Sequence, residues 1–111
     1  MTYQMRLHEI PFNQIKNGSK TIESRLNDEK RRDFKVGDLI KIYKRPDESE
    51  FLNVEIINLH ITENFIELFN SFPSSSFGGE STEDLVKSIY QYYSKDDEEK
   101  YGVVGVELKL I

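Results

Sequence analysis

The stretch Gly18-Ser-Lys-Thr-Ile-Glu-Ser-Arg25 holds the densest polar chemistry in the chain, and the other elements are arranged around it. Its glycine is expected to end one element, and the residues after it are expected to form an extended segment. Side chains alternate between the two faces of a strand. One face would carry Lys20, Ile22 and Ser24, and the other would carry Thr21, Glu23 and Arg25. Either face is a candidate wall of a binding site.

Regular patterns precede this stretch. Residues 3–7 alternate between apolar and polar side chains, which predicts a half-buried strand. Pro11 suits the first position of a helix, and Phe12 and Ile15 follow at helical spacing. The chain is therefore expected to open with a strand, a helix of about two turns and a glycine stop.

Two further strands are expected after the stretch. Val36-Gly37-Asp38 predicts a turn that leads into a strand over residues 39–43. Residues 51–61 predict another strand, but their apolar positions change parity midway, between Ile56 and Ile57. A single shift of this kind predicts a β-bulge, which bends a strand and helps a small sheet to curl toward a barrel.

The second half of the chain predicts two helices and a last strand. Residues 65–72 place aromatic and leucine side chains at helical spacing, and Ser81 with Asp84 matches a capping box that opens a second helix. Residues 72–79 predict an irregular mobile loop, and the acidic run 95–100 predicts a solvated linker. Strict alternation over residues 104–110 predicts a strand.

These elements define the expected fold class. Their order is β-α-β-β-β-α-α-β within one domain that spans residues 1–111. The strand separations favour hairpins over long crossovers, so the pairing is expected to be mostly antiparallel. We expect an α+β fold, with a small curled sheet or partly open barrel and about three flanking helices.

Composition excludes several classes of site. The chain has no cysteine, which excludes disulfides, thiolate nucleophiles and zinc sites built on sulfur, and its two histidines lie fifty-two positions apart. We therefore expect no metal site. The glycines match no dinucleotide or P-loop spacing, so no nucleotide cofactor is expected. Because there is no run of about 18 apolar residues and no leader pattern, we expect a cytoplasmic protein without membrane contact.

Charge is divided unevenly along the chain. Residues 16–45 carry ten Lys or Arg against five Asp or Glu, whereas residues 46–111 carry four against fourteen. A basic stretch on an acidic protein is a candidate phosphate-facing surface. The candidate nucleic-acid contacts are Lys30, Arg31, Arg32, Lys35, Lys41 and Lys44. The alternative is a solvated surface with no partner.

The side chains of the opening stretch suit two kinds of chemistry. Lys20 could act as a base or nucleophile if its ammonium is partly desolvated, and Glu23 could hold it charged or act as the acid partner. Arg25 has the planar fork that suits a carboxylate or phosphate, and Thr21 and Ser24 offer hydroxyl groups. Lys20 and Glu23 would lie on opposite faces of an ideal strand, so a shared pocket needs a twist or bulge. The alternative is a surface strand edge that carries ion pairs.

The spacing G-x-K-x-x-E-x-R, filled by Gly18, Lys20, Glu23 and Arg25, resembles the core motif of the ASCH family of small PUA-like β-barrels. The flanking segments 7–17 and 34–40 extend the resemblance over nearly the whole chain. It implies a partly open barrel with a cleft over which the motif side chains project. It also implies a role in binding RNA or a nucleoside-like small molecule.

Within that family, one branch is similar to amidohydrolases that remove the acetyl group from acetylated cytidine with a lysine, a threonine three positions later and a distant glutamate. Lys20 matches the lysine, Glu23 stands at the threonine position, and the glutamate position falls near Gly78, with Glu80 the closest carboxylate. Other members are similar to metal-independent ribonucleases. A small hydrolase that uses Lys20 and Glu23 is therefore the alternative to a binding module.

A protein-interaction domain that uses the acidic segment 96–99 is a third possibility. No cofactor is expected, and a monomer is favoured, although the sequence leaves the oligomeric state open. The sequence does not say which ligand is bound, whether it is turned over, or whether Glu80 completes the site.

Overall fold

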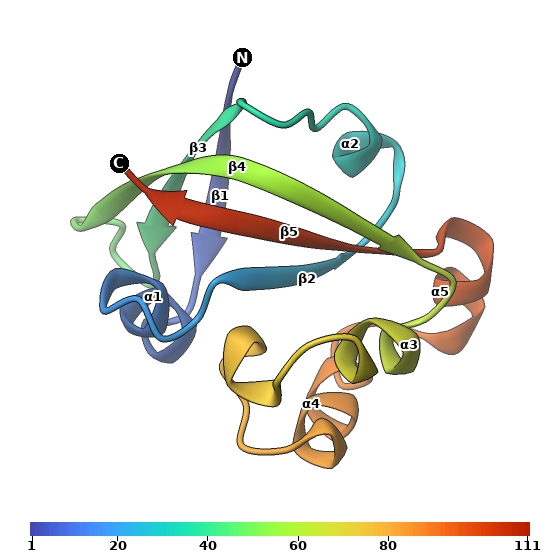
Figure 1. The fold of residues 1–111 in the computed structure, drawn as a ribbon. Coiled ribbons are helices and arrows are strands. Elements are labelled where there is room, and N and C mark those ends of the chain that lie inside the picture. Colours follow the sequence, from blue (N-terminus) through green and yellow to red (C-terminus); the bar gives the residue numbers. More distant parts are fainter.

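The computed structural model describes residues 1–111 as a curled mixed sheet with most of the helices below it (Figure 1). The strands are β1 (Thr2–Leu7), β2 (Ile22–Leu26), β3 (Leu39–Lys44), β4 (Phe51–Thr62) and β5 (Val103–Leu110). The helices are α1 (Glu9–Lys16), α2 (Glu29–Arg32), α3 (Phe65–Asn70), α4 (Thr82–Ile89) and α5 (Lys95–Tyr101), with a 3₁₀ turn, η1, over Ser74–Phe77.

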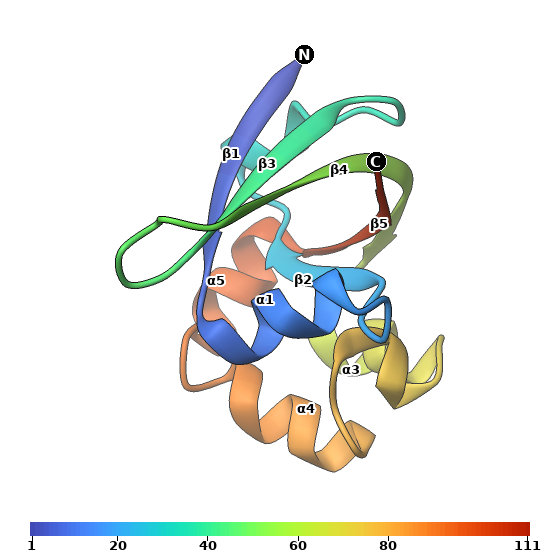
Figure 2. The ribbon, with the colours of Figure 1, turned by 90° about the vertical axis from the view of Figure 1, so that its left-hand side faces the viewer.

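The five strands form one sheet in the order β1-β3-β4-β5-β2. β1 pairs with β3 in parallel, and the other three pairs are antiparallel. The register between β4 and β5 shifts between Ile56 and Asn58, where the sequence predicted a bulge. The strong bend of β4 in Figure 2 curls the sheet into a half-barrel. The expected α+β class is confirmed, with five helices in place of about three.

Two of the helices were not expected, and the prediction that residues 95–100 form a solvated linker is wrong. α5 covers the acidic run, because Ser94 accepts a hydrogen bond from the Asp97 amide and acidic residues fill its first turn. Negative charge at a helix N-terminus is favourable. α2 begins in the same way at Asp28, which accepts from the Arg31 amide. Side-chain caps therefore form helices here without an apolar stripe.

The segment 72–79 also differs from the expected irregular loop. It contains η1, and the ring of Phe77 is buried at 4% exposure, 5.0 Å from the Phe69 ring. Gly78 follows with φ of 84°, a left-handed conformation that glycine adopts without strain. Burial of one aromatic ring fixes this segment against α3.

Apolar side chains pack into two cores on opposite sides of the sheet. The first fills the half-barrel and includes Phe12 and Ile15 of α1. The second lies between β2, β5 and the helices and includes Ile22, Phe65 and Phe77. β2 is an edge strand that lies beside α1. Its Ile22 and Leu26 belong to the second core, whereas Glu23 and Arg25 are paired with Val106 and Val104 of the first core and so face that side of the sheet.

Candidate functional site

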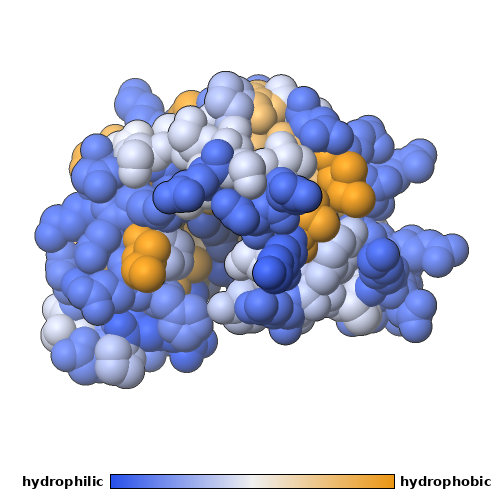
Figure 3. Space-filling view, turned by 90° about the horizontal axis from the view of Figure 1, so that it is seen from below, coloured by the Kyte–Doolittle hydropathy of each residue, from blue (hydrophilic) through white to orange (hydrophobic).

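A cleft of about 730 Å³ lies between the half-barrel and the helical layer. Its walls come from the end of β1, from α1, from β2, and from η1 and α4. The hollow is visible in Figure 3, where apolar side chains border an otherwise polar face. This volume lies in the range of about 300–1,000 Å³ that is usual for small-molecule sites. The cleft is therefore large enough to hold a ligand.

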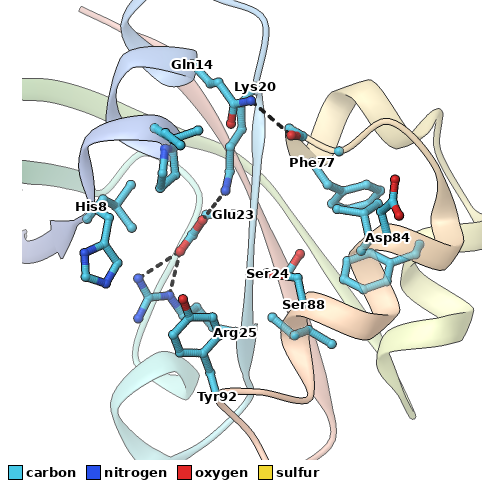
Figure 4. A pocket seen from close by; sticks show the side chains of 18 of the residues that line it. His8, Gln14, Lys20, Glu23, Ser24, Arg25, Phe77, Asp84, Ser88 and Tyr92 are labelled. Atoms are coloured by element: carbon cyan, nitrogen blue, oxygen red, sulfur yellow. Dashed lines mark hydrogen bonds and ion pairs between the residues drawn. The ribbon is translucent and has the colours of Figure 1, made fainter.

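Three motif side chains form an ion-pair cluster on one wall of the cleft (Figure 4). The Glu23 carboxylate is buried at 6% exposure. Lys20 Nζ lies 2.8 Å from Glu23 Oε1, and Arg25 Nε and Nη2 each lie 2.8 Å from Glu23 Oε2. One carboxylate is therefore held between two cations.

The local backbone explains why Lys20 and Glu23 share a wall. Lys20 precedes the first residue of β2, and its amide donates to the carbonyl of Gln14 at 3.0 Å. Gly18, with φ of 85°, turns the chain out of α1 just before it. Strict strand alternation thus does not apply at Lys20, whereas Glu23 and Arg25 share a face of β2 as expected.

Electrostatics keep Glu23 ionised. Burial alone would raise the pKa of its carboxyl, but the charges and hydrogen bonds of Lys20 and Arg25 outweigh burial and lower the pKa from 4.5 to about 2. Burial alone would lower the pKa of Arg25, but its interactions with Glu23 and Tyr93 outweigh burial. The pKa of Arg25 is therefore raised above its ordinary value. The cluster carries two positive charges and one negative charge at neutral pH.

The whole cleft is positive on an acidic protein. Its lysine, arginine, aspartate and glutamate lining residues are four cations and two carboxylates: Arg6, Lys20, Arg25, Arg45, Glu23 and Asp84. The chain as a whole has a net charge of −5. A positive cleft with low-dielectric walls attracts anionic ligands.

The opposite wall comes from α4 and the turn after it. It presents the Ser88 hydroxyl, and the ring of Tyr92, which is 67% exposed, is drawn beside Arg25 at the end of the cleft (Figure 4). An exposed tyrosine offers a flat apolar face and a polar tip. The cleft therefore combines cations with hydroxyl groups and an exposed aromatic ring.

Four of the five motif residues proposed for ligand binding line the cleft, namely Lys20, Glu23, Ser24 and Arg25. Thr21 does not line it. Its side chain is exposed, and its amide donates to the carbonyl of Ser76 at 2.9 Å. Glu80, the carboxylate closest to the expected glutamate position, is also exposed and outside the cleft lining.

None of the six basic positions proposed for nucleic-acid contact lines the cleft: Lys30, Arg31, Arg32, Lys35, Lys41 and Lys44. Arg31 pairs with Asp28 at 3.4 Å, and Arg32 Nε donates to the carbonyl of Asn27 at 2.7 Å. Lys35 and Lys30 are exposed. Contact of these six residues with nucleic acid stays a prediction, because none of them lies in the cleft itself.

Sequence reasoning missed Arg6, Arg45 and Tyr92 as cleft residues. They belong to three separate parts of the chain, and no local spacing connects them to the motif. The place of Tyr92 just after a predicted amphipathic helix was a weak signal, because its exposure of 67% depends on the tertiary structure.

No group of three or more histidine, cysteine, aspartate or glutamate side chains is placed to hold a metal ion. None of the helices has the length and apolar character needed to cross a membrane.

Comparisons with known proteins agree with this architecture. The family model described as the ASCH domain matches residues 5–111. The crystal structure of the hypothetical protein PH0355 is 35% identical with a TM-score of 0.89, and the match covers 100% of both chains. The solution NMR structure of protein PF0455 from Pyrococcus furiosus is 31% identical with a TM-score of 0.80, and covers 100% of this chain and 98% of that one. No curated protein matches the chain.

Proposed function

The chain belongs to the ASCH domain family, and from this premise we propose that its cleft binds RNA through one nucleotide unit, or a free nucleoside-like ligand. The phosphate lies against Lys20 and Arg25, and the base lies toward Tyr92. The observation that carries this proposal is the buried carboxylate of Glu23, which aligns two cations on one wall while leaving that wall positive.

Lys20 and Arg25 can bind Glu23 and a ligand at the same time. An ammonium has more than one N–H donor and a guanidinium more than two, so Glu23 leaves donors free on both Lys20 and Arg25. Their side chains are only 11% and 17% exposed, so they are already held in place. A pre-positioned guanidinium loses little freedom when it binds a phosphate. Glu23 therefore acts as a positioning residue for the two cations.

Binding has more support than hydrolysis. A carboxyl group with a pKa of about 2 is not a proton donor at neutral pH, so Glu23 does not suit the role of an acid partner. Lys20 Nζ lies 2.8 Å from Glu23 Oε1, so a reaction at that nitrogen would first have to break this ion pair. The amidohydrolase and ribonuclease alternatives both require Lys20 to react, and therefore both require this ion pair to be broken.

Fluorescence anisotropy of a labelled single-stranded adenosine octamer at low salt tests the proposal. We expect saturable binding by the wild-type protein, and a loss of about tenfold or more in affinity for Arg25→Ala and for Tyr92→Ala. Tyr92 is 67% exposed, so its truncation leaves the fold intact.

Arg31→Ala is the matched control. Arg31 is 16% exposed and paired with a carboxylate, as Arg25 is, but it lies outside the cleft. We expect this variant to bind as the wild type does. Wild-type protein without saturable binding, or equal losses for Arg25→Ala and Arg31→Ala, would refute the cleft as the site. A screen of acylated nucleosides against a Lys20→Ala control tests the hydrolase alternative, for which we expect no turnover.

A further inference from the structure

Cations and aromatic rings alternate on the outer face of the sheet next to the cleft. Lys41 Nζ lies 4.0 Å from the centre of the Phe51 ring and 5.5 Å from that of Tyr43. Arg6 Cζ, on the neighbouring strand β1, lies 5.5 Å from the centre of the Tyr43 ring of β3. The Tyr43 and Phe51 rings are 6.1 Å apart. These four residues form what we call the outer row.

Strand register fixes the outer row. Arg6 of β1 is opposite Tyr43 of β3, and Tyr43 is opposite Phe51 of β4. The three strands lie side by side in both ribbon views (Figures 1 and 2). Their neighbours Leu7 and Ile42 point into the core, so side chains of the opposite parity point outward. With about 4.8 Å between strands, the row spans about 10 Å across the sheet.

Charge and exposure leave the outer row open to an anionic partner. Lys41 forms no ion pair, and neither does the adjacent Arg45. Arg6 pairs with Glu48 at 3.2 Å, but both side chains are more than a third exposed, so solvent weakens this pair. The Phe51 ring is 46% exposed. An exposed ring beside an unpaired ammonium suits a base and its phosphate.

The outer row is continuous with the cleft. Arg6 belongs to both, and Arg45, which follows the end of β3, also lines the cleft. We propose that the outer row is a track for single-stranded RNA, so that the ligand of the cleft is a nucleotide within an oligonucleotide and the adjoining nucleotides run over Tyr43 and Phe51. This inference rests on the proposed function, and it gives Lys41 a role apart from the basic segment 30–35.

The test compares a mononucleotide with an oligonucleotide. Adenosine 5′-monophosphate reaches only the cleft, whereas a labelled adenosine octamer also reaches the outer row. We expect Phe51→Ala to weaken octamer binding about tenfold and to leave monophosphate binding unchanged. We expect Lys41→Gln to weaken octamer binding and to reduce the slope of log K against log salt by about 0.7, the value for one phosphate contact on a single strand.

Two control variants are matched to these positions. Ile66→Ala removes an apolar side chain that is also 46% exposed, but from α3. Lys100→Gln removes a lysine that also lies over a ring, 5.0 Å from Tyr101, but in α5. Neither variant is expected to change octamer binding.

The outcomes separate this inference from the proposed function. Octamer binding that depends on Arg25 but is unchanged in Phe51→Ala and Lys41→Gln overturns the track and leaves the cleft as a nucleotide site. An octamer that binds no more tightly than the monophosphate also overturns it. If a glutamate octapeptide displaces the RNA octamer equally well, the row is a site for acidic peptides and the inference is wrong. If neither nucleotide ligand binds the wild-type protein, both proposals are wrong.

Discussion

Replacement of Glu23 by glutamine removes the charge from the centre of the ion-pair cluster and keeps the shape of the side chain. Lys20 and Arg25 are then left as two adjacent cations, only 11% and 17% exposed, without their shared carboxylate. Removing one member of a buried ion pair is strongly destabilising, because the remaining charge stays desolvated. The variant should therefore fold less stably at neutral pH.

The pKa of Glu23 sets the size and the pH window of the effect. The carboxyl titrates near 4.5 in an unfolded chain and at about 2 in the folded protein. At about 1.4 kcal/mol per pH unit, this difference amounts to about 3 kcal/mol of stability from the ionised form. Because the folded-state pKa is the lower one, this contribution is complete above pH 4.5 and is lost as the pH falls toward 2.

Urea denaturation followed by circular dichroism from pH 7 to pH 2.5 measures the effect. The free energy of unfolding of Glu23→Gln should be about 3 kcal/mol lower than that of the wild type at pH 7, and the two should converge as the pH falls. Glu50→Gln is the control, because Glu50 also contacts two lysines, Lys16 and Lys44, but at an exposed position. It should lose much less stability. A Glu23→Gln loss no larger than that of Glu50→Gln at pH 7, or one that does not shrink in acid, would refute this electrostatic reasoning.

Three further predictions follow from the packing. Gly78→Ala should destabilise the protein more than Gly18→Ala in thermal melts. Both glycines have nearly the same positive φ, but an added Cβ would clash with Gln14 at Gly78 and would meet no atom at Gly18. Equal losses of stability would contradict this prediction. Gly105→Ala should cost about 1–3 kcal/mol in urea, because its Cβ would lie 2.9 Å from Leu68 Cδ1; an unchanged midpoint would show that the core relaxes. Ultraviolet titration should find one tyrosine with a pKa near 12, since burial and the 2.6 Å hydrogen bond from Tyr90 to Glu98 raise its pKa, and Tyr90→Phe should remove that component; titration of every phenol near 10 would contradict it.

Much of the sheet could be predicted because its signals are local. Alternation over residues 104–110 reports the two faces of one strand, and the parity change between Ile56 and Ile57 reports the bulge in β4. α2 and α5 were missed because they have no apolar stripe. The sequence signal of both helices was an N-terminal capping residue, Asp28 for α2 and Ser94 for α5. Ser94 with Asp97 three positions later already matched a capping box in the sequence.

The candidate site could be predicted only where its residues are close in sequence. Lys20, Glu23 and Arg25 belong to one motif, so their residue types and spacing were sufficient. Burial of Glu23 could not be predicted, because it depends on the position of β2 between two cores. The same residue types would also occur on an exposed edge strand. Arg6 and Tyr92 reach the cleft only through tertiary packing, since they lie at the end of β1 and after α4.

The central claim is that a nucleotide binds in the cleft beside Arg25. A ¹⁵N-HSQC titration of the wild-type protein with adenosine 5′-monophosphate tests it most directly, because each backbone amide reports its own surroundings. The cleft predicts saturable shifts at Ser24, Gly78, Gly79 and Tyr92, which Arg25→Ala abolishes. Shifts confined to the basic segment 30–35, or no saturable shift, would contradict the claim.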